Sequence, residues 1–330
     1  MENNYTLRIS VTSLCNLNCI YCNTQRVANP RELMSEKDIE DLLRAAFQAG
    51  IKKVSWTGGE PTIRPDFLKL VKKAKEIGIV RQSLTTNGIL YSKIAEDLRE
   101  YGLTKINFSL DSLESEKYKK ICGYDGLHKV ITSIDKAVDL YNKIKINCVV
   151  TKSNISIIGE MIDYFDKYNG KVVVRFLEIV PCGQMYEYNK SIFEDQFVSE
   201  NEMLNHMKDI GELTPVKIFG DVPKSSYFKI KGKRGIYGVN PNFSVGFKCD
   251  QKKCPKIRVS PNGFVSNCTI NLNHVRDFRN KTLEEKIELM KEIVKEKKRR
   301  DYSGFLHRQK YYDFWRFGVT PEYIDKKFKK

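Results

Sequence analysis

Three cysteines near the N-terminus narrow the chemistry of this chain more than any other residues. Cys15, Cys19 and Cys22 form a C-x3-C-x2-C pattern directly after a short run that is predicted to be a strand. Three thiolates can hold three of the four irons of a 4Fe-4S cubane, which leaves the fourth iron open to another ligand. The triad therefore predicts an iron-sulfur centre with one reactive iron.

Zinc binding and disulfide bonding are two simpler uses for such cysteines. Structural zinc takes four protein ligands, commonly as two close pairs, and no fourth Cys or His follows nearby. Disulfides are disfavoured because the polar start MENNYTLRIS has no apolar secretory region, no apolar run reaches membrane-spanning length, and the cysteines number nine. We therefore expect a reducing, cytoplasmic location and no membrane partner.

The motifs around the triad resemble those of the radical S-adenosylmethionine (SAM) superfamily. They are the run RISVTSLCNLNCIYC and, further along, Gly58-Gly59-Glu60-Pro61. The resemblance implies that the open iron binds SAM and that one electron cleaves SAM to methionine and a 5'-deoxyadenosyl radical, which abstracts hydrogen from a substrate. An external one-electron reductant of the flavodoxin or ferredoxin type is implied by this chemistry.

The elements that must position these residues alternate between strands and helices over the first half of the chain. The predicted strands cover 7–11, 53–57, 82–86, 105–109, 145–150 and 172–177, and the predicted helices include 35–49 and 156–168. Such an α/β alternation predicts a parallel sheet, as an open sheet or a barrel. The motifs TGGE, TTNG and SLDS follow successive strands, at the edge where both folds place their sites. The resemblance implies a partial (β/α)6 TIM-like barrel.

The chain after about residue 182 is more irregular, with short β-like runs separated by turn signals. We predict three regions: a radical SAM partial barrel over 1–181, a C-terminal iron-sulfur cap over 182–300, and a basic aromatic tail over 301–330. A helix is predicted over 282–298, and its lysine-rich end suits the negative pole of the helix dipole.

A second cysteine set lies in the predicted cap. Cys249, Cys254 and Cys268 have the spacing C-x4-C-x13-C. A zinc knuckle or buried free thiols would be the simpler explanations. Beside the first triad, an auxiliary 4Fe-4S cluster is favoured. Its open iron could bind substrate, unless Cys182 supplies a fourth ligand and closes the site.

The whole arrangement resembles the GTP 3',8-cyclase family of molybdenum-cofactor biosynthesis (MoaA-like), in the runs LRISVTSLCNLNCIYC, VSWTGGEP, TTNG, INFSLDS, IKINCVV, VRFLEIVP and KIRVSPNG. The resemblance implies abstraction of H3' from GTP, attack of the ribose radical on C8, and binding of the purine by the auxiliary cluster. It places SAM at Tyr21, Gly58, Gly59, Glu60, Asn87 and Ser109. It places the nucleotide at Arg8, Thr86, Lys145, Lys256 and Arg258. A triphosphate needs several cationic hydrogen-bond donors, and four of these five residues are Lys or Arg.

Four departures from the family pattern loosen the assignment of the substrate. Ser55 stands where the family has an Arg, and Lys256 stands where an Arg is usual and cannot make the same bidentate fork. The second cysteine set has C-x4-C in place of C-x2-C. The sequence ends in the basic run 326–330 and not in the family's Gly-Gly. We therefore expect a divergent member.

Two alternatives remain open at this point. One is a radical SAM enzyme that acts on a peptide or another small molecule. The other, less favoured, is a nucleic-acid-binding iron-sulfur protein that uses the basic aromatic tail. The formal net charge of +16 suits anionic substrates without identifying one.

Overall fold

Six parallel strands from the first half of the chain form the centre of the molecule. The computed structural model describes residues 4–22, 33–179, 195–217, 226–240, 254–267 and 275–299. The central strands are β1 (Thr6–Ser10), β2 (Lys53–Thr57), β3 (Arg81–Thr86), β4 (Leu103–Ser109), β5 (Ile144–Val150) and β6 (Val172–Glu178). Each pairs with the next in sequence order. Every predicted strand is confirmed to within two residues at its ends.

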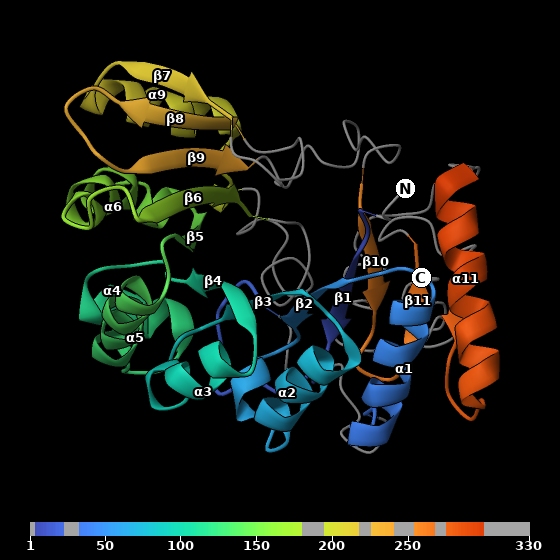
Figure 1. The fold of residues 1–330 in the computed structure, drawn as a ribbon. Coiled ribbons are helices and arrows are strands. Elements are labelled where there is room, and N and C mark those ends of the chain that lie inside the picture. Colours follow the sequence, from blue (N-terminus) through green and yellow to red (C-terminus); the bar gives the residue numbers. More distant parts are fainter. Residues whose placement is uncertain are drawn as a thin grey trace.

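Helices cover the outer side of this row of strands (Figure 1). They are α1 (Glu36–Gln48), α2 (Phe67–Ile77), α3 (Ala95–Glu100), α4 (Ser115–Cys122), α5 (Leu127–Leu140) and α6 (Ile157–Asp166), with 3-10 turns at Pro61–Ile63, Tyr91–Lys93 and Lys152–Asn154. Successive side chains of a strand point to opposite faces of the sheet, so apolar residues face the helices and polar residues face the other side. Leu7 and Ile9 are fully buried in the core, whereas Arg8 between them is only half-buried. The predicted start of α1 is confirmed, since Ser35 and Asp38 form a reciprocal capping box.

The second half of the chain extends both edges of the sheet. At one edge β9 (Ile236–Asn240) runs parallel to β6 and continues into antiparallel β8 (Ser226–Ile230) and β7 (Leu213–Val216). At the other edge β10 (Lys256–Val259) runs parallel to β1 and continues into antiparallel β11 (Phe264–Ser266) and β12 (Arg276–Asp277). Helix α9 is Glu200–Ile210, and α11 is Leu283–Arg299. Over the described residues the twelve-stranded sheet stays open, which agrees with a partial barrel.

The sheet is strongly curved. Six strand-to-strand steps separate β10 from β6 in the sheet order, which is about 29 Å in a flat sheet. Yet Arg175 on β6 lies close enough to Lys256 on β10 for its charge to lower the pKa of that lysine. Figure 1 shows the strands in an arc from β10 to β9. The curvature therefore turns the polar positions of distant strands toward a common interior. Whether 1–181 and 182–300 are separate units stays a prediction.

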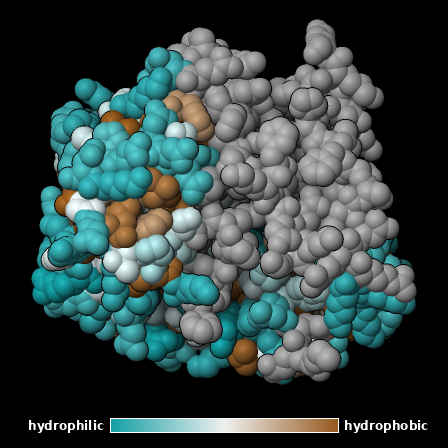
Figure 2. Space-filling view, turned by 90° about the horizontal axis from the view of Figure 1, so that it is seen from above, coloured by the Kyte–Doolittle hydropathy of each residue, from teal (hydrophilic) through white to brown (hydrophobic). Residues whose placement is uncertain are grey.

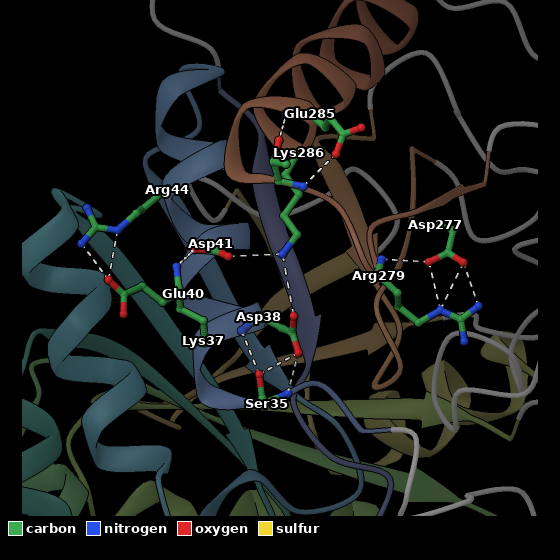
Figure 3. A network of polar contacts seen from close by, with 11 residues as sticks. Ser35, Lys37, Asp38, Glu40, Asp41, Arg44, Asp277, Arg279, Glu285 and Lys286 are labelled. Carbon is green, nitrogen blue, oxygen red and sulfur yellow. Dashed lines mark hydrogen bonds and ion pairs between the residues drawn. The ribbon is translucent and has the colours of Figure 1, made fainter.

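Helix α11 packs against α1 through charged side chains (Figure 3). Lys286 of α11 has a 5% exposed side chain, and its ammonium lies 3.3 Å from Asp41 and 3.7 Å from Asp38. The predicted helix over 282–298 is confirmed with a shift of one residue. The last described helix is therefore fixed to the first.

The surface that the structure describes is mainly hydrophilic when viewed from above, with hydrophobic residues in small groups (Figure 2). None of the helices in the described part is long and apolar enough to span a membrane.

Candidate active site

The segment from Thr12 to Cys22 is held by its backbone on two sides. The amide of Gly59 donates to the Thr12 carbonyl at 2.7 Å, and the amides of Asn18 and Ile20 donate to carbonyls at the end of α4 at 2.9 and 3.0 Å. A Cβ at Gly59 would lie 2.0 Å from the Leu14 carbonyl oxygen, so only glycine fits this approach. The predicted glycine pair thus lies directly against the backbone at the start of the cysteine loop.

The three predicted cluster ligands lie in this loop, with Cys22 buried and Cys15 and Cys19 half-buried. Burial, with a smaller contribution from the charges of Glu60, Cys19 and Cys22, raises the pKa of the Cys15 thiol to about 12. Within the described ranges, no three Cys, His, Asp or Glu side chains converge closely enough to share one metal ion. A cubane does not require such convergence, because each thiolate binds a different iron. Three cysteines on one loop are thus a donor set that a 4Fe-4S cluster can use.

Glu60 joins the loop to the ends of β3. Its side chain is 1% exposed and accepts hydrogen bonds from the amide of Asn87 at 2.6 Å and the hydroxyl of Thr86 at 2.7 Å. The side-chain amide of Asn87 in turn donates to Asn16 at 2.7 Å and lies 3.8 Å from the Cys15 sulfur. Burial raises the pKa of Glu60, although these hydrogen bonds oppose the increase. Thr86, expected at the nucleotide, thus contacts Glu60.

Asp111 holds the aromatic residue of the cysteine motif. The Tyr21 hydroxyl donates to Asp111 Oδ2, and the amide of Val149 donates to Oδ1 at 2.7 Å. Burial raises the pKa of Asp111 to about 6, while both hydrogen bonds act in the opposite direction. The pair ties the loop to β4 and β5. The sequence motif SLDS contained Asp111, but its pairing with Tyr21 is a tertiary contact that the spacing does not reveal.

Five cations occupy polar positions of β1, β5, β6 and β10, and they are Arg8, Lys145, Arg175, Lys256 and Arg258. Arg8 and Arg258 are register partners, and the Arg8 guanidinium lies 3.4 Å from the Thr57 hydroxyl. The Lys145 ammonium lies 5.7 Å from the centre of the Tyr227 ring. The Nε of Arg258 is buried without a hydrogen-bond partner in the described part of the chain. A buried donor of this kind suits an anionic ligand.

The charges of three of these cations act on a fourth, Lys256. Burial, together with the charges of Arg8 and Arg258, lowers the pKa of Lys256 to about 7. Burial alone would raise the pKa of the Cys254 thiol, but the charges of Arg258 and Lys297 bring it below its ordinary value. A thiol that loses its proton readily is suited to bind iron. Cys254 therefore fits the proposed auxiliary cluster.

Arg175, Asn147 and Lys297 are site residues that the sequence analysis did not assign. The Arg175 Nε donates to the Asn147 side chain at 2.9 Å, which fixes the guanidinium relative to β5. Arg175 stands between the buried Val174 and Phe176, so strand alternation could have identified it as inward-facing. Helical spacing could likewise have identified Lys297.

The remaining predicted residues are only partly covered. Ser109 ends β4 and is the register partner of Asn147. Cys182, Cys249, Cys268 and the tail over 301–330 lie outside the described residues, so their roles stay predictions.

Comparisons with known proteins agree on one family. Residues 9–165 match the family model described as the Radical SAM superfamily. The chain is 33% identical over 275 residues to a "Probable GTP 3',8-cyclase" of Pyrococcus abyssi, which covers 82% of this chain and 87% of that protein. It is 36% identical over 267 residues to a "GTP 3',8-cyclase" of Clostridium acetobutylicum, with coverage of 79% and 80%.

A solved structure shows the same fold. The crystal structure of Streptococcus suis SuiB bound to S-adenosylmethionine matches with a TM-score of 0.58 at 19% identity. The match covers 85% of this chain and 64% of SuiB, so the chain spans less than two thirds of that protein.

Proposed function

Because this chain belongs to the GTP 3',8-cyclase family of radical SAM enzymes, we propose that it acts on a nucleoside triphosphate, with GTP as the first candidate. The product would carry a new bond between ribose C3' and guanine C8. Family members use a SAM-binding 4Fe-4S cluster and a second, auxiliary cluster. When bound, these groups and SAM supply the one-electron cleavage that yields a hydrogen-abstracting 5'-deoxyadenosyl radical.

The residues of the first loop bind and orient these groups. Cys15, Cys19 and Cys22 would hold the first cluster. Tyr21 is held by Asp111, so its ring has a fixed position next to the cluster ligands. Glu60 accepts a hydrogen bond from the backbone amide of Asn87 and so fixes this residue, whose side-chain amide lies 3.8 Å from the Cys15 sulfur. The loop is thus held in one geometry before any ligand arrives.

The group of cations formed by Arg8, Arg175, Lys256 and Arg258 is the observation that carries the nucleotide proposal, because the charges of the three arginines all act on Lys256. Several like charges in a partly buried site repel one another, and an anionic ligand relieves that repulsion. Phosphate groups bind to arginine and lysine through strong, charge-assisted hydrogen bonds. Asn147 orients Arg175 toward such a ligand.

Two departures from the family pattern lie within this cation group. Ser55 is the register partner of Arg8, so Arg8 supplies the positive charge at this position of the β1–β2 pair. Lys256, with its pKa near 7, gains positive charge when an anion binds beside it. Both residues leave phosphate binding in place while they change its geometry.

The electron donor and the location of the enzyme belong to the same proposal. Reductive cleavage of SAM requires one electron from outside the chain. An external donor of the flavodoxin or ferredoxin type and a cytoplasmic location remain our expectation.

The test is anaerobic reconstitution of the clusters, followed by incubation with SAM, reductant and each of the four common ribonucleoside triphosphates. We expect GTP to raise 5'-deoxyadenosine formation and to give a cyclised product that mass spectrometry detects at the mass of GTP. If no nucleotide raises 5'-deoxyadenosine above background, the proposal is wrong.

A matched pair of variants tests the cation site itself. Arg258→Gln removes a half-buried guanidinium whose Nε is enclosed, whereas Arg81→Gln removes an exposed guanidinium at the start of β3. A charge-assisted hydrogen bond contributes about 1.5–3 kcal/mol, so nucleotide affinity should fall by roughly 10- to 100-fold in Arg258→Gln. SAM affinity should stay unchanged in both. Equal nucleotide affinity in the two variants would argue against the site.

A further inference from the structure

Arg64 follows the GGEP motif, and its guanidinium joins two parts of the backbone that are distant in sequence. It lies directly after the 3-10 turn at Pro61–Ile63, and its side chain is 10% exposed. One nitrogen, Nη1, donates to the carbonyl of Val11 at 2.8 Å and to the carbonyl of Met34 at 2.9 Å. The sequence motifs assigned no role to this arginine.

The two carbonyls lie on either side of the first cysteine set. Val11 directly follows β1, and Met34 directly precedes the N-cap of α1. All three cysteines of the first set lie between these two residues in sequence. Because one nitrogen contacts both carbonyls, the chain leaves β1 and returns to α1 at nearly the same point. Arg64 therefore connects the two ends of the segment that contains the cysteine loop.

Each of these ends is also attached to a different part of the sheet. The amide of Val11 donates to the Thr57 carbonyl at the end of β2, at 2.8 Å. The amide of Met34 donates to the Pro261 carbonyl between β10 and β11, at 2.9 Å. One end thus contacts the first half of the chain, and the other contacts the second half. The guanidinium of Arg64 contacts both ends and fixes the distance between them.

Asp66 holds the guanidinium in the orientation that these contacts require. Its carboxylate accepts hydrogen bonds from Nε of Arg64 at 2.6 Å and from Nη2 at 2.8 Å, which makes a bidentate ion pair. The side chain of Asp66 is 20% exposed, so the pair is largely shielded from solvent. A lysine cannot reproduce this arrangement, because its donors share one nitrogen and lack the planar fork. The position therefore requires arginine and not only a positive charge.

The turn that leads to Arg64 also holds the cysteine loop itself. The amide of Glu60 donates to the Leu14 carbonyl at 2.8 Å, and Leu14 directly precedes Cys15. The Glu60 carboxylate accepts from the amide of Thr62 at 3.0 Å and from its hydroxyl at 2.6 Å, which closes the turn. Arg64 therefore fixes the ends of the segment, while Glu60 fixes the backbone beside the first cluster ligand.

We propose that Arg64 is a positioning residue for the SAM-binding cluster, because it holds the cysteine loop in the form that receives the cluster. The proposal rests on the part of the proposed function in which Cys15, Cys19 and Cys22 hold this cluster, and it does not depend on the nucleotide. A loop that is ordered before its ligand arrives loses less conformational entropy on binding. Residues that orient metal ligands change metal affinity by roughly 10- to 100-fold when they are replaced.

The experiment compares Arg64→Lys with Arg44→Lys in the reconstituted full-length chain. Arg44 is exposed on α1 and pairs with Glu40, so its variant is a matched change of an arginine–carboxylate pair. Electron paramagnetic resonance of the reduced protein identifies the first cluster as the signal that changes when SAM is added. We expect an iron chelator to remove this signal roughly 10- to 100-fold faster in Arg64→Lys than in the wild type. Arg44→Lys should match the wild type.

Hydrogen exchange of the metal-free chain measures the order of the loop without any cluster. In Arg64→Lys we expect faster exchange over residues 12–22 and unchanged exchange over α5. Faster exchange throughout the chain would mean that Arg64 supports only general stability, and the positioning role would be wrong.

A second variant covers the case in which Arg64→Lys fails to fold. Asp66→Asn keeps the guanidinium but weakens the pair that orients it, so we expect a smaller increase in the rate of cluster loss. If Arg64→Lys and Asp66→Asn both lose the cluster at the rate of Arg44→Lys, the role of Arg64 is disproved while the proposed function stands. If the reconstituted wild type shows no SAM-dependent signal, the ligand assignment is wrong, and the role of Arg64 is rejected with it.

Discussion

The two cysteine regions of this molecule differ in the charge that surrounds them. At Cys15, burial raises the thiol pKa to about 12, and the nearby Glu60 carboxylate acts in the same direction. At Cys254, burial is outweighed by Arg258 and Lys297, which bring the thiol pKa below its ordinary value. The same donor atom therefore has opposite electrostatic surroundings at the two places.

This difference separates the two kinds of ligand. The first region contains the buried carboxyl groups of Glu60 and Asp111, which suit the positively charged sulfonium of SAM. The second region contains cations from β1, β6, β10 and α11, which suit phosphate groups. Separate regions of opposite charge disfavour exchange of the two ligands between their sites.

Removing one cysteine from each region should have the largest effect. It should separate SAM cleavage, assigned to the first region, from conversion of the nucleotide, assigned to the second. In Cys15→Ala we expect both 5'-deoxyadenosine and product to fall to background, because SAM has no open iron to bind. In Cys254→Ala we expect SAM cleavage to continue while the cyclised product is lost, because only the substrate end is damaged. Chromatography after anaerobic turnover measures the amounts of 5'-deoxyadenosine and of the cyclised nucleotide. Product at the wild-type level in Cys254→Ala would contradict the division of roles.

Replacing the buried acid of the first region should change how stability depends on pH. Burial raises the pKa of Asp111 to about 6 from an ordinary 3.8, so between these values the folded chain holds more protons than the unfolded chain. The free energy of unfolding therefore decreases as pH rises from about 4 to 6. Asp111→Asn removes this contribution, which is about 3 kcal/mol over the range.

Urea denaturation of the metal-free protein from pH 4.5 to 7 measures that difference. The exposed Asp125→Asn is the matched control and should keep the pH dependence of the wild type. A slope in Asp111→Asn equal to that of the control would mean that Asp111 is not protonated in this range.

Loosening the contact between α11 and α1 should have the smallest effect of the three changes. Lys286→Met leaves Asp38 and Asp41 without their cation from α11, although Lys37 still contacts Asp41. We expect a loss of about 2 kcal/mol in the free energy of unfolding. The exposed Lys291→Met on the same helix is the control, and it should change stability by less than about 0.5 kcal/mol. Identical unfolding curves for the two variants would show that the buried contact has no net effect.

The central strands could be predicted from the sequence because local signals specify them. Runs such as Lys145 to Val150 alternate between buried and half-buried positions, and the capping box at Ser35 marks the start of α1 without any distant contact. The grouping of Gly59 and Glu60 with the cysteine loop could also be predicted, because both follow the carboxyl ends of neighbouring parallel strands.

The parts that could not be predicted depend on pairing between distant segments. Nothing in the sequence of β10 indicates that it runs parallel to β1, and this pairing places Arg258 beside Arg8. The lysine-rich end of the last helix was assigned to the helix dipole, whereas Lys297 within it is buried, although lysine is rarely buried. Tertiary contacts override a general residue preference here.

The pairing of β1 with β10 has a consequence for how the protein is made. The first strand leaves the ribosome early, but its partner on that side is complete only after Val259 has been synthesised. Until then, one edge of β1 has no neighbouring strand, which is a state prone to aggregation. We therefore expect nascent chains that stop before β10 to depend on chaperones.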